Sequence, residues 1–418
     1  MVYLAGVSGN LNRQKSTIKL KTPVLVNEVL FYTGLIIWLV ASVLYQTSLE
    51  EVISEEIQSV KGLGLFTCFV SEIISKNRYQ RSDLVQIIAL FLVAVGSFCV
   101  HNTALFQSFL LIYFARNFKI ERVLTCFAWT IGLSLVLVYL FSFTGLISSL
   151  DLVESSIRQA RSSMGFVWPS RFPTFFLAVV MAYVCVKRNN TSNIVLILMF
   201  LVNIYIYTET NSRNPFLATA LFIVIIFIKK YISISKKRKR TYKKTYLIKL
   251  IIPALLLLSV LAPYIYDSAS SFWTEVDRLL ANRLLFSNLA LSNSFFSLWG
   301  DGRLLNQENV NPFIDGVLDS GYLTLLFGYG IIACLIVLTG FACAFVLSYV
   351  KRDFYLFFAL LITLLFSLLY SHMIIYLCYS PIMFYIPYFI RETIKDITCP
   401  TNKKRKSKKV PTMQTGRG

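Results

Sequence analysis

The stretch Val123–Leu146 reads VLTCFAWTIGLSLVLVYLFSFTGL and carries no charged residue over 24 positions. A helix rises about 1.5 Å per residue, so this run is long enough to cross the roughly 30 Å hydrocarbon core of a bilayer. Similar apolar runs recur along the chain and predict further spans at 27–47, 60–75, 83–100, 103–116, 166–186, 192–208, 214–229, 248–265, 320–350, 353–370 and 373–390. The pattern predicts an all-α polytopic membrane protein with about 12 transmembrane helices, in which 320–350 forms one long tilted helix.

The composition agrees with lipid as the main solvent. Hydrophobic residues make up 56% of the 418 residues, and charged residues only 15%, where soluble domains average about 25%. The net charge of +20 could indicate nucleic-acid binding on a soluble protein, but here the basic residues lie in short loops between apolar runs. We therefore expect no nucleic-acid partner. Two basic tracts, 236–240 and 403–406, favour contact with anionic membrane lipid.

The distribution of Lys and Arg predicts the orientation, because cytoplasmic loops are enriched in these residues. Alternate loops of the predicted topology hold all but eight of the 41 basic residues. Both termini are therefore predicted to be cytoplasmic. The expected organisation is a cytoplasmic segment 1–26, a transmembrane domain 27–390 with outer loops 147–165 and 266–319, and a basic cytoplasmic tail 391–418.

The eight basic residues of the outer face are candidates for function, because outer Arg and Lys work against this rule. Seven of them are arginines, whose guanidinium fork matches a phosphate in two hydrogen bonds. The alternative is pairing with outer carboxylates or lipid headgroups. The residues are Lys61, Arg158, Arg161, Arg171, Arg213, Arg278, Arg283 and Arg303.

Local patterns narrow this set. Arg158 and Arg161 share a helix face if their segment is helical, and Asn211-Ser-Arg213-Asn-Pro215 fills a very short turn, where Pro215 suits the first turn of the next helix. Arg278 and Arg283, with interleaved leucines, predict an amphipathic helix lying on the membrane. These five arginines are our candidate ligands for a pyrophosphate.

Two residues could move a proton. Asp319 stands before the apolar run 320–350, so it is either a helix N-cap or a carboxylate that activates a hydroxyl group. His372 follows the run 353–370 and is a second candidate acid or base. No P-loop, dinucleotide fold signature, HExxH or DxD motif occurs, which argues against nucleotide chemistry and a metal site.

Four stretches, in this order, resemble the Wzy-type O-antigen and capsular polysaccharide polymerases, a group that also contains the O-antigen ligases. They are Arg161…Gly165-Phe…Pro169, Asn211-Ser-Arg213-Asn-Pro-Phe, Asp277-Arg278…Arg283…Leu298-Trp-Gly300 and Leu318-Asp319-Ser-Gly-Tyr322-Leu…Tyr329-Gly330-Ile-Ile. Ser320 stands where the family often has Asn, and Asn282 where Gly is frequent. Whether Arg278 or Arg283 matches the family arginine stays open.

The resemblance implies a GT-C-like fold and a metal-independent inverting glycosyltransferase in the bacterial cytoplasmic membrane. The enzyme would join repeat units carried on undecaprenyl pyrophosphate, with no cofactor. Arginines would bind the donor pyrophosphate, Asp319 or His372 would assist the acceptor hydroxyl, and Tyr322 and Asn211 would contact the glycan. A flippase and a chain-length regulator are the implied partners. The rival functions are a lipid-linked oligosaccharide flippase, a ligase and a membrane scaffold.

Overall fold

The computed structural model describes residues 22–75, 80–149, 161–232, 242–280, 282–292, 294–305 and 318–398. Within these ranges the chain is helical, with one isolated antiparallel bridge between Thr47 and Phe166. The helices are α1 (Thr22–Leu44), α2 (Glu50–Ile74), α3 (Arg81–Cys99), α4 (Ala104–Ala115), α5 (Ile120–Phe143), α6 (Arg171–Lys187), α7 (Asn193–Thr210), α8 (Arg213–Tyr231), α9 (Tyr242–Tyr264), α10 (Ser271–Leu279), α11 (Arg283–Ser292), α12 (Gly321–Leu323), α13 (Gly330–Lys351), α14 (Phe354–Phe366) and α15 (Ile386–Thr398).

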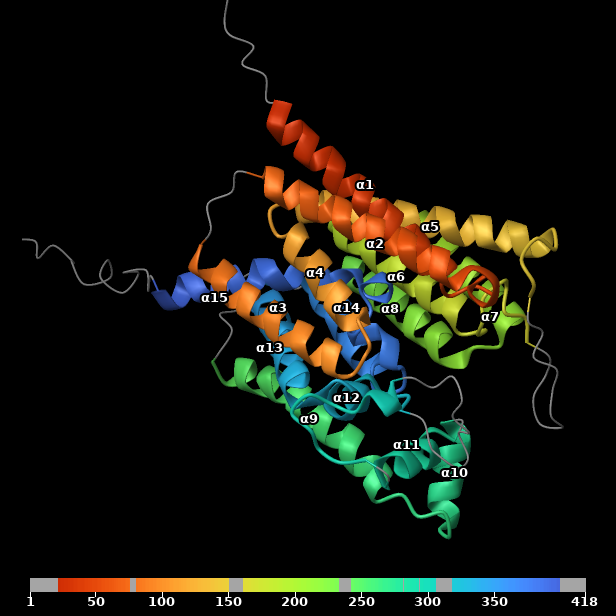
Figure 1. The fold of residues 1–418 in the computed structure, drawn as a ribbon. Helices are drawn as coiled ribbons and strands as arrows, with labels where there is room; N and C mark the ends of the chain where they lie inside the picture. Colours follow the sequence, from red (N-terminus) through yellow and green to blue (C-terminus); the bar gives the residue numbers. More distant parts are fainter. Residues whose placement is uncertain are drawn as a thin grey trace, which may run out of the picture.

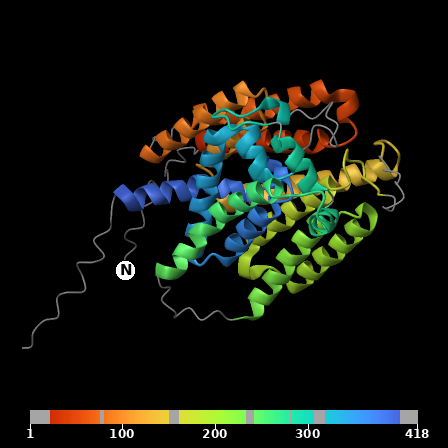
Figure 2. The same cartoon turned by 90° about the horizontal axis from the view of Figure 1, so that it is seen from below.

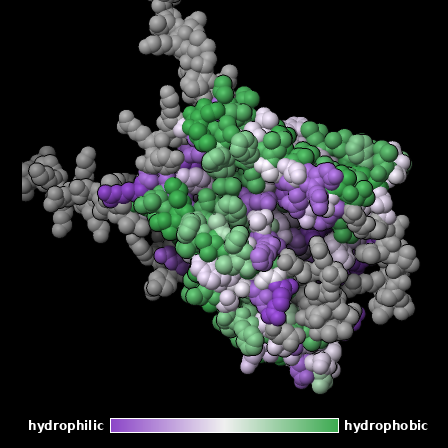
Figure 3. All heavy atoms as spheres, in the orientation of Figure 1, coloured by the Kyte–Doolittle hydropathy of each residue, from purple (hydrophilic) through white to green (hydrophobic). Residues whose placement is uncertain are grey.

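Seven of the described helices are long and apolar enough to cross a membrane: α1, α2, α3, α5, α7, α8 and α13. Shorter apolar helices occupy Ala104–Ala115, Ile248–Tyr264 and Phe354–Phe366. Large apolar areas lie on the face of the molecule drawn in Figure 3, as expected where lipid is the solvent. The prediction of a helical membrane protein is therefore confirmed at this level.

The C-terminal helices form the middle of the molecule. Helix α13 contacts α3, α9, α14 and α15, and Figure 2 shows the C-terminal helices between the N-terminal helices on one side and α7 to α9 on the other. Helix α6 is buried along nearly its whole length among α5, α7, α8 and α14. Helices α10 and α11 lie together at the lower right of Figure 1, beyond the long helices.

Glycines allow the closest helix contact, between α1 and α2. A Cβ atom on Gly34 would lie 2.7 Å from the Gly64 carbonyl oxygen, and one on Gly64 would lie 2.8 Å from the Gly34 carbonyl oxygen. Gly64 and Cys68 are four residues apart and both face α1. Small residues at this spacing let membrane helices approach backbone to backbone.

Contacts at helix ends and in loops join segments that the predicted topology places on the same side. At one end, buried Asp83 accepts from the Arg391 guanidinium at 2.9 Å, and Arg188 pairs with Asp353 at 3.0 Å. At the other end, the Val167 N–H donates to the Gln46 carbonyl. The predicted number of spans, the alternation of loops and the orientation of the termini stay predictions.

Two predicted spans are wrong as continuous helices. In 320–350, α12 passes into a π-helical turn at Thr324–Gly328, and the chain then breaks at Gly330, whose φ is +90°. A Cβ on Gly330 would lie 2.4 Å from the Gly300 nitrogen, so the two backbones touch there. In 373–390, three 3-10 turns at Ser371–Ile374, Leu377–Tyr379 and Pro381–Tyr385 precede α15.

Candidate functional site

A cluster of charged and aromatic side chains brings together four segments that are far apart in the sequence. Arg283 Nε lies 3.8 Å from Asp319 Oδ2. Arg171 and Arg283 both act electrostatically on Asp319 and on His372. We call Arg171, Arg283, Asp319, His372 and the tyrosines Tyr370, Tyr376 and Tyr379 the arginine cluster.

Local capping places Arg283 in this cluster. The buried Asp277 carboxylate, in α10, accepts the Leu284 N–H at 2.8 Å and so caps the first turn of α11. Asn282 joins the two helices in a left-handed conformation, with φ of 65°, which Asn tolerates better than most residues. The Asp277-Arg278 and Asn282-Arg283 pairs are therefore the two ends of one tight connection.

This connection separates the two arginines that the sequence left as alternatives. Arg278, in α10, is 71% exposed and forms two hydrogen bonds to Glu275, at 2.6 and 2.9 Å. Arg283, in α11, is 20% exposed and points to Asp319. The predicted single amphipathic helix is thus two helices, and only Arg283 belongs to the arginine cluster.

Arg171, the first residue of α6, is held by aromatic rings. Its Nη1 donates to the Tyr379 hydroxyl at 3.2 Å, and its guanidinium lies 5.9 Å from the centre of that ring. The Tyr379 ring in turn packs on Phe175 at 4.3 Å, one turn further along α6. Arg171 was predicted to be one of the outer arginines but not a ligand of the pyrophosphate. Its position next to the 161–169 motif was the sequence feature that could have indicated such a role.

His372 lies among three tyrosine rings that the sequence analysis missed. Its ring stacks on Tyr376 at 4.9 Å and lies 5.1 Å from Tyr370 and 5.7 Å from Tyr379. The 3-10 turns at Ser371–Ile374 and Leu377–Tyr379 carry His372 and Tyr379, and they leave the Tyr370 ring on the same side as these two, where a continuous helix would turn Tyr370 away. The spacing YSHxxxYxxY was the sequence feature that could have indicated this group, but the contacts between the rings depend on the geometry of the turns.

Burial and the neighbouring arginines shift the pKa values of both candidate acid–base residues, His372 and Asp319. Burial lowers the pKa of His372 well below its ordinary value, and Arg171 and Arg283 lower it further. Burial raises the pKa of the Asp319 carboxyl, while the two arginines oppose this rise. The Asp319 side chain keeps 36% of its surface accessible, so solvent partly screens these effects. These shifts favour the neutral form of the imidazole and make the carboxylate more basic than usual.

Two buried polar atoms of the arginine cluster have no hydrogen-bond partner in the described part of the chain. They are Arg283 Nη1 and the Tyr370 hydroxyl. Buried donors of this kind are nearly always paired in native proteins, and a charged one left unpaired is costly. An anion bound at either atom would supply the missing acceptor.

The N-cap interpretation of Asp319 is wrong. The N-cap of α12 is Ser320, and no side chain caps this short helix. Tyr322, predicted to contact a glycan, is fully buried, and its hydroxyl donates to the Leu364 carbonyl at 3.0 Å. Tyr322 therefore has a structural position and leaves no surface for a sugar.

Arg161, Asn211 and Arg213 form a neighbouring region. The Ser162 N–H donates to the Glu209 carbonyl in the last turn of α7, which puts the Arg161 segment beside the α7–α8 turn. Asn211 ends α7 in a left-handed conformation with φ of 45°, and Arg213 begins α8 with an exposed side chain. Pro215 is in the first turn of α8, as predicted. The 161–171 segment runs from this region to Arg171.

Three of the predicted features, Arg158 and the two basic tracts at 236–240 and 403–406, lie outside the described residues. Arg303 is described, but its side chain is 81% exposed and pairs with Asp301 at 2.6 Å. We therefore do not include Arg303 in the arginine cluster.

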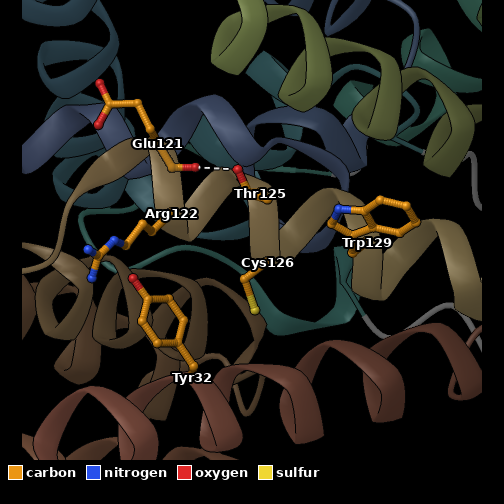
Figure 4. Close-up of a pocket in the computed structure, with 6 residues that line it drawn as sticks. All are labelled: Tyr32, Glu121, Arg122, Thr125, Cys126 and Trp129. Atoms are coloured by element: carbon orange, nitrogen blue, oxygen red, sulfur yellow. Dashed lines mark hydrogen bonds between the residues drawn. The ribbon is translucent and has the colours of Figure 1, made fainter. Parts of the chain in front are cut away.

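A pocket of about 430 Å³ lies at the other end of the molecule, between α1 and α5. Figure 4 shows its lining, with Arg122 near Tyr32 at one side and Trp129 at the other. Arg122 pairs with Glu28 at 3.1 Å, and the walls are almost entirely apolar. The pocket contains none of the predicted site residues.

Comparison of the chain with protein-family models, with curated proteins and with solved structures gives no match.

Proposed function

We propose that this chain is a polysaccharide polymerase that joins oligosaccharide repeat units carried on undecaprenyl pyrophosphate, at the outer face of the bacterial cytoplasmic membrane. The observation that carries the proposal is the arginine cluster. Two arginines, a carboxylate and a histidine from four separate segments meet there, and Arg283 Nη1 and the Tyr370 hydroxyl are buried without a partner among the described residues. The guanidinium groups of this cluster are the donors that bind phosphate oxygens most strongly.

The reaction needs charge stabilisation at one oxygen and proton removal at another. The bond between the anomeric carbon of the donor glycan and its phosphate oxygen breaks, and the electron pair leaves with the lipid diphosphate. A hydroxyl oxygen of the acceptor repeat forms the new bond to that carbon and gives up its proton. Arg171 and Arg283 stabilise the negative charge that grows on the leaving diphosphate, a role that a divalent metal fills in nucleotide-sugar enzymes. A direct displacement of this kind inverts the anomeric carbon, and the resemblance implies that the enzyme is metal-independent and has a GT-C-like fold.

Asp319 is the better candidate for the base. Its raised pKa moves the carboxylate toward neutral pH, where a general base is most effective. The lowered pKa of His372 keeps the imidazole neutral, so that it can hydrogen-bond the acceptor hydroxyl without adding a third positive charge. We therefore assign proton removal to Asp319 and orientation of the acceptor to His372.

The test is chain growth by purified protein in lipid nanodiscs with synthetic undecaprenyl-pyrophosphate repeat units. The wild type should give a ladder of longer glycans, and Arg283→Gln and Arg171→Gln should each slow chain growth strongly, so that most repeats stay single. Arg213→Ala, next to the Arg161 segment, should fold normally and also accumulate single repeats. The control is Arg303→Gln, which removes an exposed arginine that also pairs with a carboxylate and should leave the ladder unchanged.

The same assay separates the rival functions. Transfer of a finished glycan to a different acceptor would indicate a ligase. Movement of the lipid-linked repeat across the membrane without new glycosidic bonds would indicate a flippase. Wild-type ladders from Arg283→Gln would remove the arginine cluster from the chemistry and with it the basis of the proposal.

A further inference from the structure

Lys61 is a cation within a helix that is long and apolar enough to cross the membrane. It lies in the span Val52–Ile74 of α2, nine residues after the span begins. Charged residues inside such spans are costly to keep, and those that persist often serve a ligand or an ion. The alternative is that the ammonium simply extends to the membrane surface. The contacts of Lys61 decide between these two roles.

The close crossing of α1 and α2 sets the surroundings of Lys61. Gly64, which touches the Gly34 backbone, is three residues after Lys61, and Trp38 is four residues after Gly34. Residues at these spacings share one helix face. The same contact that joins the helices therefore turns Lys61 toward Trp38 and into the protein.

Two aromatic rings, those of Trp38 in α1 and Tyr45 just after it, lie next to the ammonium group of Lys61. The Lys61 nitrogen lies 5.1 Å from the centre of the Tyr45 ring and 5.7 Å from that of Trp38. Among the described residues no carboxylate is within 4.0 Å of it, although Glu50 acts on it at longer range. A cation held by rings keeps its hydrogen-bond donors for an anion, whereas one held by a carboxylate must first lose that partner.

Lys61 also neighbours the arginine cluster. Lys61 and Arg171 both act electrostatically on Cys378, and Tyr45 and Arg171 both act on Tyr376. Cys378 and Tyr376 belong to the 3-10 segment that carries His372. Lys61 and Arg171 therefore both act on this one 3-10 segment.

We propose that Lys61, on its platform of Tyr45 and Trp38, binds the diphosphate of the second lipid-linked molecule, the acceptor. This inference rests on the proposed function, in which two lipid diphosphates are present at once. One leaves from the donor at Arg171 and Arg283. The other stays attached to the acceptor and needs a separate cation, because two diphosphates on one pair of arginines would repel each other.

The test counts bound lipids by native mass spectrometry of the detergent-solubilised protein with undecaprenyl pyrophosphate. The wild type should take up two molecules, and Lys61→Met should take up one. Lys61→Arg should keep both, because the charge is retained. Arg283→Gln should also take up one, and the Lys61→Met/Arg283→Gln double variant none. Thermal unfolding checks that each variant is folded, with Lys61→Gln as a second neutral variant.

Two results would overturn the inference. One is a second lipid still bound by folded Lys61→Met or Lys61→Gln, which would make Lys61 a structural clamp between α1 and α2. The other is equal binding of phosphatidylglycerol or inorganic pyrophosphate at this position, which would make it a contact for any headgroup or free anion. Counting bound lipids does not require chain growth. A protein that binds a second lipid through Lys61 but forms no glycosidic bond would therefore refute the proposed polymerase function and leave the inference about Lys61 standing.

Discussion

Replacing Arg283 by Gln should move the acidic limb of the pH–rate profile to higher pH. Asp319 must be deprotonated to accept a proton, so the rate rises as the pH passes its pKa. Burial raises this pKa and Arg283 lowers it. Without the Arg283 charge the carboxylate loses its nearest stabilising cation, and its pKa rises further. The same substitution should also slow the reaction at every pH. The quantity to compare between variants is therefore the pH at which the acidic limb lies, and not the absolute rate.

The structure gives the size of this shift. Arg283 Nε and Asp319 Oδ2 are 3.8 Å apart, a separation worth about 4 kcal/mol at an effective dielectric constant of roughly 20. The side chains are 20% and 36% accessible, so solvent screening reduces the coupling to about 1–2 kcal/mol. Since about 1.4 kcal/mol corresponds to one pKa unit, the limb should move up by about one unit.

The assay is the initial rate of chain extension in nanodiscs, measured across the acidic range for four proteins. Arg283→Lys, which keeps the charge, should leave the limb close to the wild-type position. Arg303→Gln should leave it unchanged, because that arginine pairs with Asp301 instead. A limb that stays in place in Arg283→Gln, or moves to lower pH, would refute the coupling between these two residues and the assignment of Asp319 as the base.

Three further predictions concern the scaffold. Gly330→Ala should lower the free energy of unfolding, because it forces an L-residue to a φ of +90° and places its Cβ 2.4 Å from the Gly300 nitrogen. The backbone strain alone should cost about 1–3 kcal/mol, and the close contact adds to it. Asp83→Asn should cost about 3–5 kcal/mol, because it leaves the partly buried Arg391 without its carboxylate. Asp277→Ala should cost about 0.5–2 kcal/mol through the lost cap of α11 and should lower polymerisation by displacing Arg283.

Each scaffold prediction has a matched control. Gly62→Ala, also a glycine substitution, should not destabilise α2, since no atom lies within 4 Å of the new Cβ. Glu28→Gln breaks an exposed ion pair with Arg122 and should cost less than about 1 kcal/mol. Glu275→Gln frees Arg278 in the same helix as Asp277 and should leave polymerisation intact. Equal loss of activity in Glu275→Gln and Asp277→Ala would show that α10 matters for a reason other than the position of Arg283.

The sequence by itself was enough to predict that lipid surrounds this protein, and it also predicted much of the local structure. Uncharged runs such as 123–146 specify membrane-spanning helices, because an unpaired backbone polar group is too costly in lipid. The position of Pro215 in the first turn of a helix was also readable from the chain. These features depend on neighbours in the sequence or on the bilayer.

The tertiary structure alone decided which arginine belongs to the site. Arg278 and Arg283 are five residues apart, but the left-handed turn at Asn282 sends one to Glu275 and the other to Asp319. Likewise, the apolar run 373–390 has the composition of a span, yet it forms 3-10 turns that gather Tyr370, His372 and Tyr379 around Arg171. Hydropathy records how apolar a segment is, not whether lipid or protein surrounds it, and only the packing of distant helices answers that question.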